Sequence, residues 1–352
     1  MPHSFLYIAN PARIVFGPGS LAQMNDEVRQ LGCAQALVLS TPSRRKDAER
    51  LIQQLGNIGV GVISEAAMHT PEEVTERALP AYAAMGADCV VALSGGSTVG
   101  LGKAIAYRNN APQLVIATTS AGSEVTAILG QTENGVKTTV KHESILPEVV
   151  IYDAELTLGL PVSTSVTSAL NAMAHALEGL YAQERNPITA LMAVEGIGVL
   201  KEALPIIVQQ PENLEARNNA LYGAWLCGTV LGTVGMALHH KLCHTLGGSF
   251  NLPHAETHAI MLPHTMAYNA QAAAEMLAPA AELFAGDLGG GLYDFAQGLQ
   301  APLALKELGL AEADLDKVAD LAVQNPYWNP QPIERQAVRE LLQRAWSGTR
   351  PE

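Results

Sequence analysis

The sequence carries few charges for its length. Charged residues make up 16% of its 352 residues, against roughly 25% in an average soluble protein. Acidic side chains outnumber basic ones 34 to 21, which gives a formal net charge of -13, and no basic run is present. These two absences argue against binding to nucleic acid or to anionic membranes. An anionic substrate would therefore need positive groups placed locally in its pocket.

Closely spaced cysteine pairs and long apolar runs are also missing. None of the cysteines (Cys33, Cys89, Cys227 and Cys243) belongs to a C-x-x-C pair, which favours a reducing compartment. The first residues lack the profile of a signal peptide, and no apolar run is long enough for a membrane helix. We therefore expect a cytoplasmic protein.

The first half alternates short apolar runs with helical stretches. Strands buried on both faces typically show such runs without polar alternation, and the repeated order predicts a parallel sheet covered by helices. The helix predicted within 70–86 opens with Thr70 as its cap and Pro71 in its first turn. The predicted strands are ALVLS (36–40), VGVIS (60–64), CVVALS (89–94), LVIATTS (114–120) and EVVIYD (148–153).

After about residue 160 nearly every segment has helical periodicity, interrupted by proline and glycine. One such interruption is the stretch LGGSFNLPH (246–254). We therefore predict a Rossmann-like dinucleotide-binding α/β domain over 1–158 and an all-helical catalytic domain over 159–352.

Two polar turns follow predicted strands. Gly95 and Gly96 directly follow CVVALS and precede a helix, so a diphosphate could approach the backbone there. The pattern is not G-x-G-x-x-G, and an ordinary strand-to-helix turn fits it equally well. The second turn, ATTSAGSEVT (117–126), is dense in hydroxyls suited to phosphate and ribose. Open α/β sheets bind ligands at such strand ends, so we predict that a dinucleotide contacts Gly95, Gly96, Ser97, Thr118, Thr119 and Ser123.

Four histidines fall within HHKLCHTLGGSFNLPH (239–254). On a helix, His240 and His244 share a face because they are four residues apart, and so do Asn171 and His175. His254 lies beyond a turn and can fold back toward the same place.

This set is compatible with three kinds of site. Three imidazoles and one oxygen can hold a divalent metal, although Asn171 offers only a neutral oxygen where a carboxylate would neutralise the ion. Partly protonated imidazoles can instead bind carboxylates and deliver a proton. The third possibility is buried histidines bonded to backbone carbonyls, which we assign only to His239 and His264.

An ordered series of motifs resembles the iron-containing alcohol dehydrogenase family over almost the whole chain. The resemblance implies the dehydroquinate synthase-like fold of that family, with an α/β domain and an all-α domain. The segments that carry it are VFGPGSL (15–21), SGGSTVGLGK (94–103), TTSAGSEVT (118–126), LPEVVIYDAELTLGLP (146–161), NAMAHALEGLYA (171–182), HHKLCHTLGG (239–248) and LPHAETHAIMLPH (252–264).

Three positions depart from the family pattern. The family usually has aspartate where Asn171 and Gly100 stand, and asparagine where His258 stands. The family's metal set would fall on Asn171, His175, His240 and His254, so its lost aspartate implies an enzyme that needs no metal. Two alternatives stay open: a metal-dependent alcohol or polyol dehydrogenase, and a nucleotide-binding relative without activity.

The resemblance also implies NADH or NADPH as hydride donor. Thr41 stands where many relatives carry an aspartate that bonds the adenosine ribose, so a 2′-phosphate is not repelled. Arg44 or Arg45 could receive that phosphate or simply cap a solvated helix, and we expect NADH to work and NADPH to be tolerated. Lys137 matches a lysine beside the cofactor, and an exposed loop lysine is an equal alternative.

The reaction implied by the departures is reduction of a carbon–carbon double bond conjugated to a ketone, in a small dianionic acid from aromatic-compound degradation. Asn171, His175, His240 and His254 would bind the substrate, and the three histidines would stabilise the resulting enolate. We predict His244 as the acid nearest the nicotinamide. The resemblance further implies a homodimer and a site in the cleft between the domains.

Overall fold

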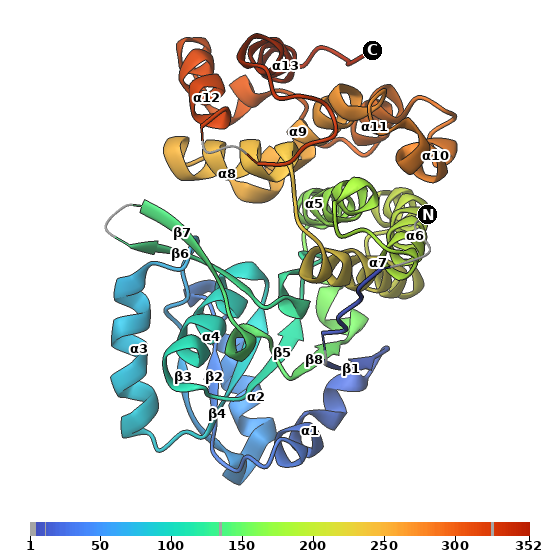
Figure 1. The fold of residues 1–352 in the computed structure, drawn as a ribbon. Helices are drawn as coiled ribbons and strands as arrows, with labels where there is room; N and C mark the ends of the chain where they lie inside the picture. The colour runs from blue at the N-terminus through green and yellow to red at the C-terminus, as the bar shows by residue number, and fades with distance from the viewer. Residues whose placement is uncertain (1–4, 11, 134–135, 325–326) are drawn as a thin grey trace. The chain divides into compact units, whose positions relative to one another are not determined.

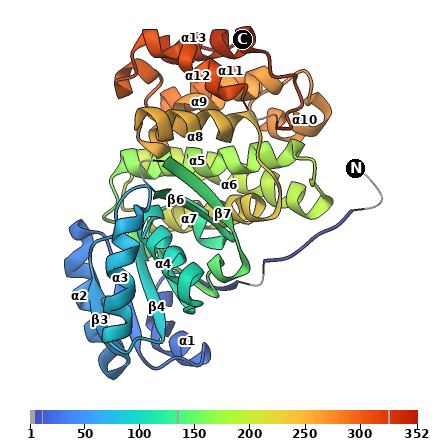
Figure 2. The same ribbon diagram turned by 60° about the vertical axis from the view of Figure 1, so that its left-hand side comes forward.

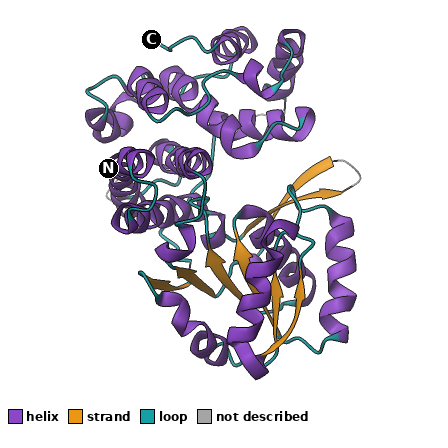
Figure 3. Cartoon of the chain, turned by 180° about the vertical axis from the view of Figure 1, so that it is seen from behind, coloured by secondary structure: helices purple, strands orange, loops and turns teal. Residues whose placement is uncertain are grey.

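The computed structural model describes residues 5–10, 12–133, 136–324 and 327–352. The chain divides into two compact units, Ala9–Leu160 and Pro161–Glu352, and the described residues before Ala9 group with the second unit. Residues 159 and 160, which the sequence assigned to the helical half, therefore belong to the first. The described strands all lie in the first unit, and the second consists of helices and connecting loops (Figure 3).

A six-stranded parallel sheet forms the centre of the first unit, in the order β1-β8-β5-β4-β2-β3. All five predicted runs form strands of this sheet, which confirms the predicted fold class. The sixth strand, β1, was not predicted; it pairs along the edge with β8. The strands are β1 (Arg13–Phe16), β2 (Ala36–Leu39), β3 (Gly59–Ile63), β4 (Cys89–Ser94), β5 (Gln113–Ala117) and β8 (Val149–Tyr152).

Helices cover both faces of this sheet (Figure 1). They are α1 (Met24–Gln30), α2 (Arg45–Leu55), α3 (Glu72–Ala84) and α4 (Gly96–Asn109). Val38 shares a core cluster with Leu51 of α2, whereas its neighbour Leu37 shares another with Ile105 of α4. Because successive side chains of a strand point to opposite faces, both residues are buried, which explains the unbroken apolar run.

The predicted start of the helix within 70–86 is wrong. Thr70 has a φ of +45°, and α3 begins at Glu72, with Pro71 at its cap position and no side-chain cap. The Thr70 carbonyl instead accepts a hydrogen bond from the amide of Thr132 (3.2 Å). Thr132 belongs to an antiparallel hairpin that was not predicted, β6 (Ile128–Glu133) and β7 (Val136–Lys141). A contact with a strand 62 residues later therefore overrides the local capping pattern.

The second unit is built around α5, whose residues are all buried from Ser165 to Tyr181. A helix that is apolar on every side belongs in the centre of a bundle, and α5 packs against α6, α7 and α9; its course along α6 is seen in Figure 2. The helices are α5 (Val162–Tyr181), α6 (Pro187–Gln209), α7 (Leu214–Thr233), α8 (Leu238–Phe250), α9 (His254–Asn269), α10 (Ala274–Leu283), α11 (Leu288–Gly298), α12 (Leu315–Ala322) and α13 (Arg335–Ser347).

The turn expected between His244 and His254 is shorter than the sequence suggested. Helix α8 continues through both glycines of the GGSF stretch as far as Phe250. It ends at Asn251, whose φ of +54° is left-handed, a conformation that asparagine tolerates better than most residues. His254 is then the first residue of α9.

Within the described residues, no single helix is both long and apolar enough to cross a membrane. Helices α7 and α8 meet that criterion of length and composition only as a pair, and the pair is bent by 95°.

Gly179 allows α5 and α7 to pack closely, because a Cβ atom there would collide with Cγ1 of Val230. We predict that Gly179→Ala lowers the free energy of unfolding by about 1–3 kcal/mol, as overpacking of a core does. The double variant with Val230→Ala should recover part of that loss. Urea denaturation followed by circular dichroism measures both.

Gly198→Ala on α6 is the matched control, since a Cβ atom at Gly198 would meet nothing within 4 Å. It should leave stability unchanged or raise it by about 0.5–1 kcal/mol, because alanine is the better helix former. Equal losses for both variants would contradict close packing at Gly179 and point to a general effect of replacing helical glycine.

Candidate active site

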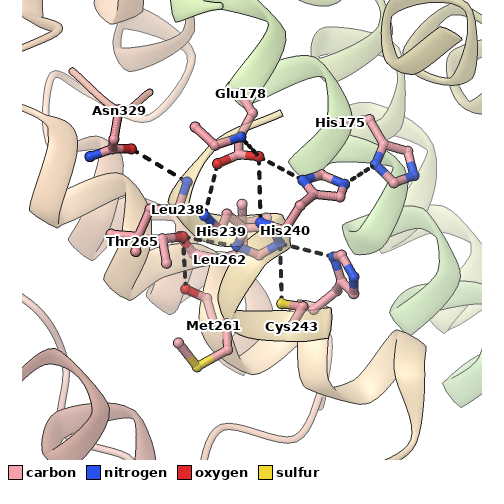
Figure 4. A network of polar contacts seen from close by, with 12 residues as sticks. His175, Glu178, Leu238, His239, His240, Cys243, Met261, Leu262, Thr265 and Asn329 are labelled. Carbon is pink, nitrogen blue, oxygen red and sulfur yellow. Dashed lines mark hydrogen bonds and ion pairs between the residues drawn. The ribbon is translucent and has the colours of Figure 1, made fainter. Parts of the chain in front are cut away.

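The carboxylate of Glu178, on α5, holds the N-terminus of α8 (Figure 4). It accepts hydrogen bonds from the amides of Ala237 (2.9 Å), His239 (2.8 Å) and His240 (3.4 Å), and Tyr181 donates to it at 3.3 Å. Helix α8 has no side-chain cap of its own. Glu178 therefore supplies the cap from another helix, and its charge also favours the positive end of the α8 dipole.

Glu178 also orients the His240 ring, whose Nδ1 lies 2.7 Å from the carboxylate. Burial alone would raise the pKa of Glu178, but the hydrogen bond with His240 lowers it to about 2. The carboxylate is therefore ionised, and His240 Nδ1 must carry a proton. Nε2 of His240 lies 2.8 Å from Nδ1 of His175. In neutral His240 this nitrogen is an acceptor, so His175 donates to it.

A second chain of hydrogen bonds begins at the hydroxyl of Thr265, which donates to the carbonyls of Met261 and Leu262. Thr265 therefore accepts from Nδ1 of His239 (2.9 Å), and Nε2 of His239 accepts from Nδ1 of His258 (2.9 Å). Burial lowers the pKa of His239 to about 3 and that of His258 well below its usual value. Both rings are neutral, and Nε2 of His258 is buried without a described partner.

These four rings and those of His244 and His254 form one group, which we call the histidine cluster. His254 lies with its ring centroid 4.4 Å from that of His258, and His244 lies 6.1 Å from His240 and 6.4 Å from His254. His244 is exposed and His254 half-buried. The structure therefore brings all four predicted histidines together, with His244 and His254 nearest to solvent within the helical unit.

Four members of this network were not predicted as site residues: Glu178, His239, His258 and Thr265. His239 was assigned a purely structural role bonded to a backbone carbonyl, yet it bonds Thr265 and His258. Glu178 carried a usable signal, since it follows His175 by three residues and so shares its helix face. His264 lies outside the cluster, and its buried ring nitrogens have no partner among the described residues.

The donor set expected from the family does not fit a permanently bound iron ion. Asn171 contributes a buried neutral oxygen, which has no described hydrogen-bond partner. The facing nitrogens of His175 and His240 bond each other. Among the described residues, the groups of three potential ligand atoms within 4.8 Å are found elsewhere, at His239, Cys243 and His258 and at Cys33, Asp88 and Cys89. Glu178 supplies the carboxylate that His240 bonds, and it does so at Nδ1, the ring nitrogen that does not face His175.

In the α/β unit, the two predicted dinucleotide turns lie side by side. Strands β4 and β5 are neighbours in register, so the turns that follow them meet at one sheet edge. Gly95 caps α4, and a Cβ atom there would lie 2.6 Å from Oγ1 of Thr119. A Cβ atom at the exposed Gly96 would instead meet nothing within 4 Å. Only glycine therefore fits at Gly95 without moving the Thr119 side chain of the second turn.

Several buried hydroxyls around these turns have no hydrogen-bond partner among the described residues: Thr98, Thr118 and Ser123. Thr98 lies in the first turn of α4, whereas Thr118 and Ser123 belong to the second turn. Buried polar groups are nearly always paired in native proteins, so these hydroxyls are suited to bonding a polar ligand. Together with the free amides at the start of α4, they fit the phosphates and ribose of a dinucleotide.

The residues proposed to select the cofactor are already engaged in local contacts. The hydroxyls of Thr41 and Ser43 lie 3.0 Å apart. Arg44 pairs with Asp47 and Arg45 with Glu49, both at the start of α2. These pairs match the interpretation that the arginines cap a solvated helix. Lys137 lies in β7, and its side chain is outside the described residues.

Gly100 has no space for a side chain, because a Cβ atom there would collide with Oγ1 of Thr70. The aspartate usual in the family is therefore incompatible with the position of Thr70, whose unusual backbone is set by the hairpin.

Comparison with known proteins shows the same two parts. Residues 11–154 match the family model described as iron-containing alcohol dehydrogenase, and residues 165–346 match the C-terminal model of the Fe-containing alcohol dehydrogenase family.

Individual relatives match over the full length. The chain is 64% identical to the maleylacetate reductase of Rhizobium sp. (strain MTP-10005) over 99% of both chains. It is 51% identical to the maleylacetate reductase of Burkholderia cepacia, again over 99% of both. The crystal structure of maleylacetate reductase from Agrobacterium tumefaciens superposes with a TM-score of 0.97 at 64% identity, covering 99% of this chain and 100% of that one.

We predict that Glu178→Gln destabilises the helical unit by about 2–3 kcal/mol, the range for hydrogen bonds to a charged group. The amide keeps one acceptor oxygen but presents N–H donors to the donors of α8 and His240. The same change should lower kcat/KM, because the His240 ring loses its anchor. Urea denaturation and steady-state kinetics measure the two effects.

Glu184→Gln is the matched control, because Glu184 accepts from the amide of Gly235 but is exposed. Such surface changes usually stay within about 0.5 kcal/mol. A Glu178→Gln variant as stable and as active as Glu184→Gln would refute the capping and orienting role.

Proposed function

Because the chain belongs to the iron-containing alcohol dehydrogenase family and is an oxidoreductase, we propose that it reduces maleylacetate, or a substituted maleylacetate, to 3-oxoadipate or its substituted form. One observation carries the proposal: the 64% identity to a maleylacetate reductase spans both units. The match therefore extends over the segments that carry the dinucleotide turns and the histidine cluster.

A nicotinamide dinucleotide fits the unpaired hydroxyls and the glycine turn of the α/β unit. When bound in reduced form it supplies the hydride, which adds to the carbon–carbon double bond conjugated to the substrate ketone. We expect NADH to be used and NADPH to be accepted, because Thr41 places no carboxylate where a 2′-phosphate would lie. The arginine pairs of α2 give no specific support for a preference for NADPH.

The carboxylates of the substrate need positive partners in a protein of net charge -13. The ionised Glu178 lies behind His240 and would stabilise positive charge on the pair His175 and His240. A protonated pair would bind a substrate carboxylate and stabilise the enolate oxygen formed after hydride transfer. Asn171 and His254 complete the proposed substrate contacts.

The second series of hydrogen bonds, from Thr265 through His239 to His258, has a different proposed role. Thr265 and His239 fix His258 with its proton on Nδ1, so Nε2 presents a lone pair toward neighbouring donors. His254, the ring nearest to it, would thereby be held with a proton pointing toward His258. The enolate must then gain a proton on carbon, and His244 is our proposed donor because it is the most exposed ring of the cluster.

We propose that this reaction needs no metal ion. The support is the donor set of Asn171, His175 and His240, which lacks an anionic ligand and in which the two imidazoles bond each other.

Self-association as a homodimer is part of the proposal. Its support is the exposure of apolar side chains near the start of the chain, where Phe5, Leu6 and Ile8 are 49%, 77% and 66% exposed. Light scattering should give twice the chain mass of 37.2 kDa, and a monomer at micromolar concentration would contradict this part.

The test of function is NADH oxidation at 340 nm with freshly generated maleylacetate, with and without a chelator. We expect turnover that chelation does not change, because no step depends on a bound ion. Asn171→Asp is the matched variant: the added carboxylate should increase the affinity for Zn²⁺, measured by metal content after dialysis.

Absence of turnover with maleylacetate, together with metal-restored activity on a simple alcohol, would overturn the proposal in favour of a metal-dependent dehydrogenase. Nucleotide binding without any turnover would indicate a relative that has lost activity.

A further inference from the structure

Lys103 is a buried lysine in the α/β unit whose position no part of the proposed reaction explains. It lies on α4 and is only 2% exposed. Its ammonium donates to the carbonyls of Ser123 (2.6 Å), Thr126 (2.8 Å) and Ile128 (2.9 Å). It also lies 2.9 Å from Oγ1 of Thr126. All of these acceptors belong to one continuous segment, the second dinucleotide turn and the first residue of β6.

No carboxylate of the described residues forms an ion pair with this ammonium. The nearest acidic influence is Glu124, whose side chain instead accepts a hydrogen bond from Tyr152 of β8 (2.7 Å). Burial lowers the pKa of Lys103 to about 7, and the charge of Glu124 acts in the opposite direction. The positive charge is therefore balanced mainly by carbonyl dipoles, as a bound metal cation would be.

The segment around Lys103 is the one that carries unpaired hydroxyls. Ser123 gives its carbonyl to the ammonium, while its own Oγ is buried without a described partner. At the other end of the turn, Oγ1 of Thr118 is likewise buried without a described hydrogen-bond partner. Tyr152 holds the turn from the sheet and Lys103 holds it from α4, so its backbone is fixed from two directions before any ligand is bound.

A structural requirement alone is a poor explanation for a lysine here. Burying an ammonium carries a large desolvation penalty, and such groups in functional regions often serve the site rather than stability. Preorganised donors bind ligands better, because the ordering cost is met on folding.

We propose that Lys103 is a positioning residue whose ammonium acts as a built-in cation, holding residues 118–126 in the conformation that binds the phosphates and ribose of the dinucleotide. Lys103 does not itself touch the nucleotide. This inference rests on the proposed use of NADH.

The experiment compares Lys103→Met with wild-type protein, measuring the dissociation constant of NADH by fluorescence titration, steady-state kinetics and thermal stability. Methionine keeps much of the length and burial but removes every donor. We expect NADH to bind at least about tenfold more weakly, equivalent to about 1.4 kcal/mol. KM for maleylacetate at saturating NADH should stay within about twofold, since the histidine cluster is unchanged.

Two control variants separate positioning from general destabilisation. Val91→Ala removes core volume from β4 in the same unit, where Val91 is fully buried, and should lower the melting temperature without weakening NADH binding. Lys46→Met removes an exposed lysine of α2 and should change neither property.

The outcomes are distinguishable. Lys103→Met with unchanged NADH affinity would overturn the proposal, and so would an equal loss of affinity in Val91→Ala. If wild-type protein binds neither NADH nor NADPH, the proposed function itself fails, whatever the variants do. Weak binding confined to Lys103→Met would establish the positioning role.

Discussion

The buried carboxylate of Glu178 is the contact on which the helical unit's site depends. In one place it caps α8, fixes the proton of His240 on Nδ1 and, through His240, orients His175. A charge buried this deeply is tolerated only because donors surround it. The same donors are the first residues of the helix that carries His240 and His244. Folding of the α5–α8 contact and assembly of the histidine cluster are therefore one event.

The histidine cluster contains two chains of hydrogen bonds that differ in charge. In our proposal the chain that starts at Glu178 carries the positive charge, whereas burial keeps His239 and His258 in the chain that starts at Thr265 neutral. A dianionic substrate needs a local positive charge in this acidic protein, and the later protonation on carbon needs a donor that is not locked in place. In the proposed mechanism His175 and His240 meet the first need, and the more exposed His244 meets the second.

Sequence patterns predicted what depends on local periodicity. Strands buried on both faces, the helical second half, and the shared helix faces of Asn171 with His175 and of His240 with His244 follow from spacing along one element. Strand β1 was missed because four residues at an edge carry little pattern. The hairpin had a usable signal in Asn134–Gly135 between two alternating runs. The spacing of Glu178 from His175 placed it on the same helix face, but its capping role could not be predicted, because the first amide that it accepts from lies 59 residues away. Lys103 could not be assigned, because its partners lie 20–25 residues away. Thr70 was misassigned because a distant amide outweighs a local cap.

The most direct test of the account is nitrogen NMR of the imidazoles in protein labelled with ¹⁵N-histidine, before and after adding 3-oxoadipate at neutral pH. Without ligand, His175, His240 and His258 should carry their protons on Nδ1. With the dianion bound, the His175–His240 pair should gain one proton while His239 and His258 stay neutral. A proton on Nε2 instead of Nδ1 of His240 in the free protein would contradict the central role given to Glu178, and so would a pair that stays neutral with 3-oxoadipate bound.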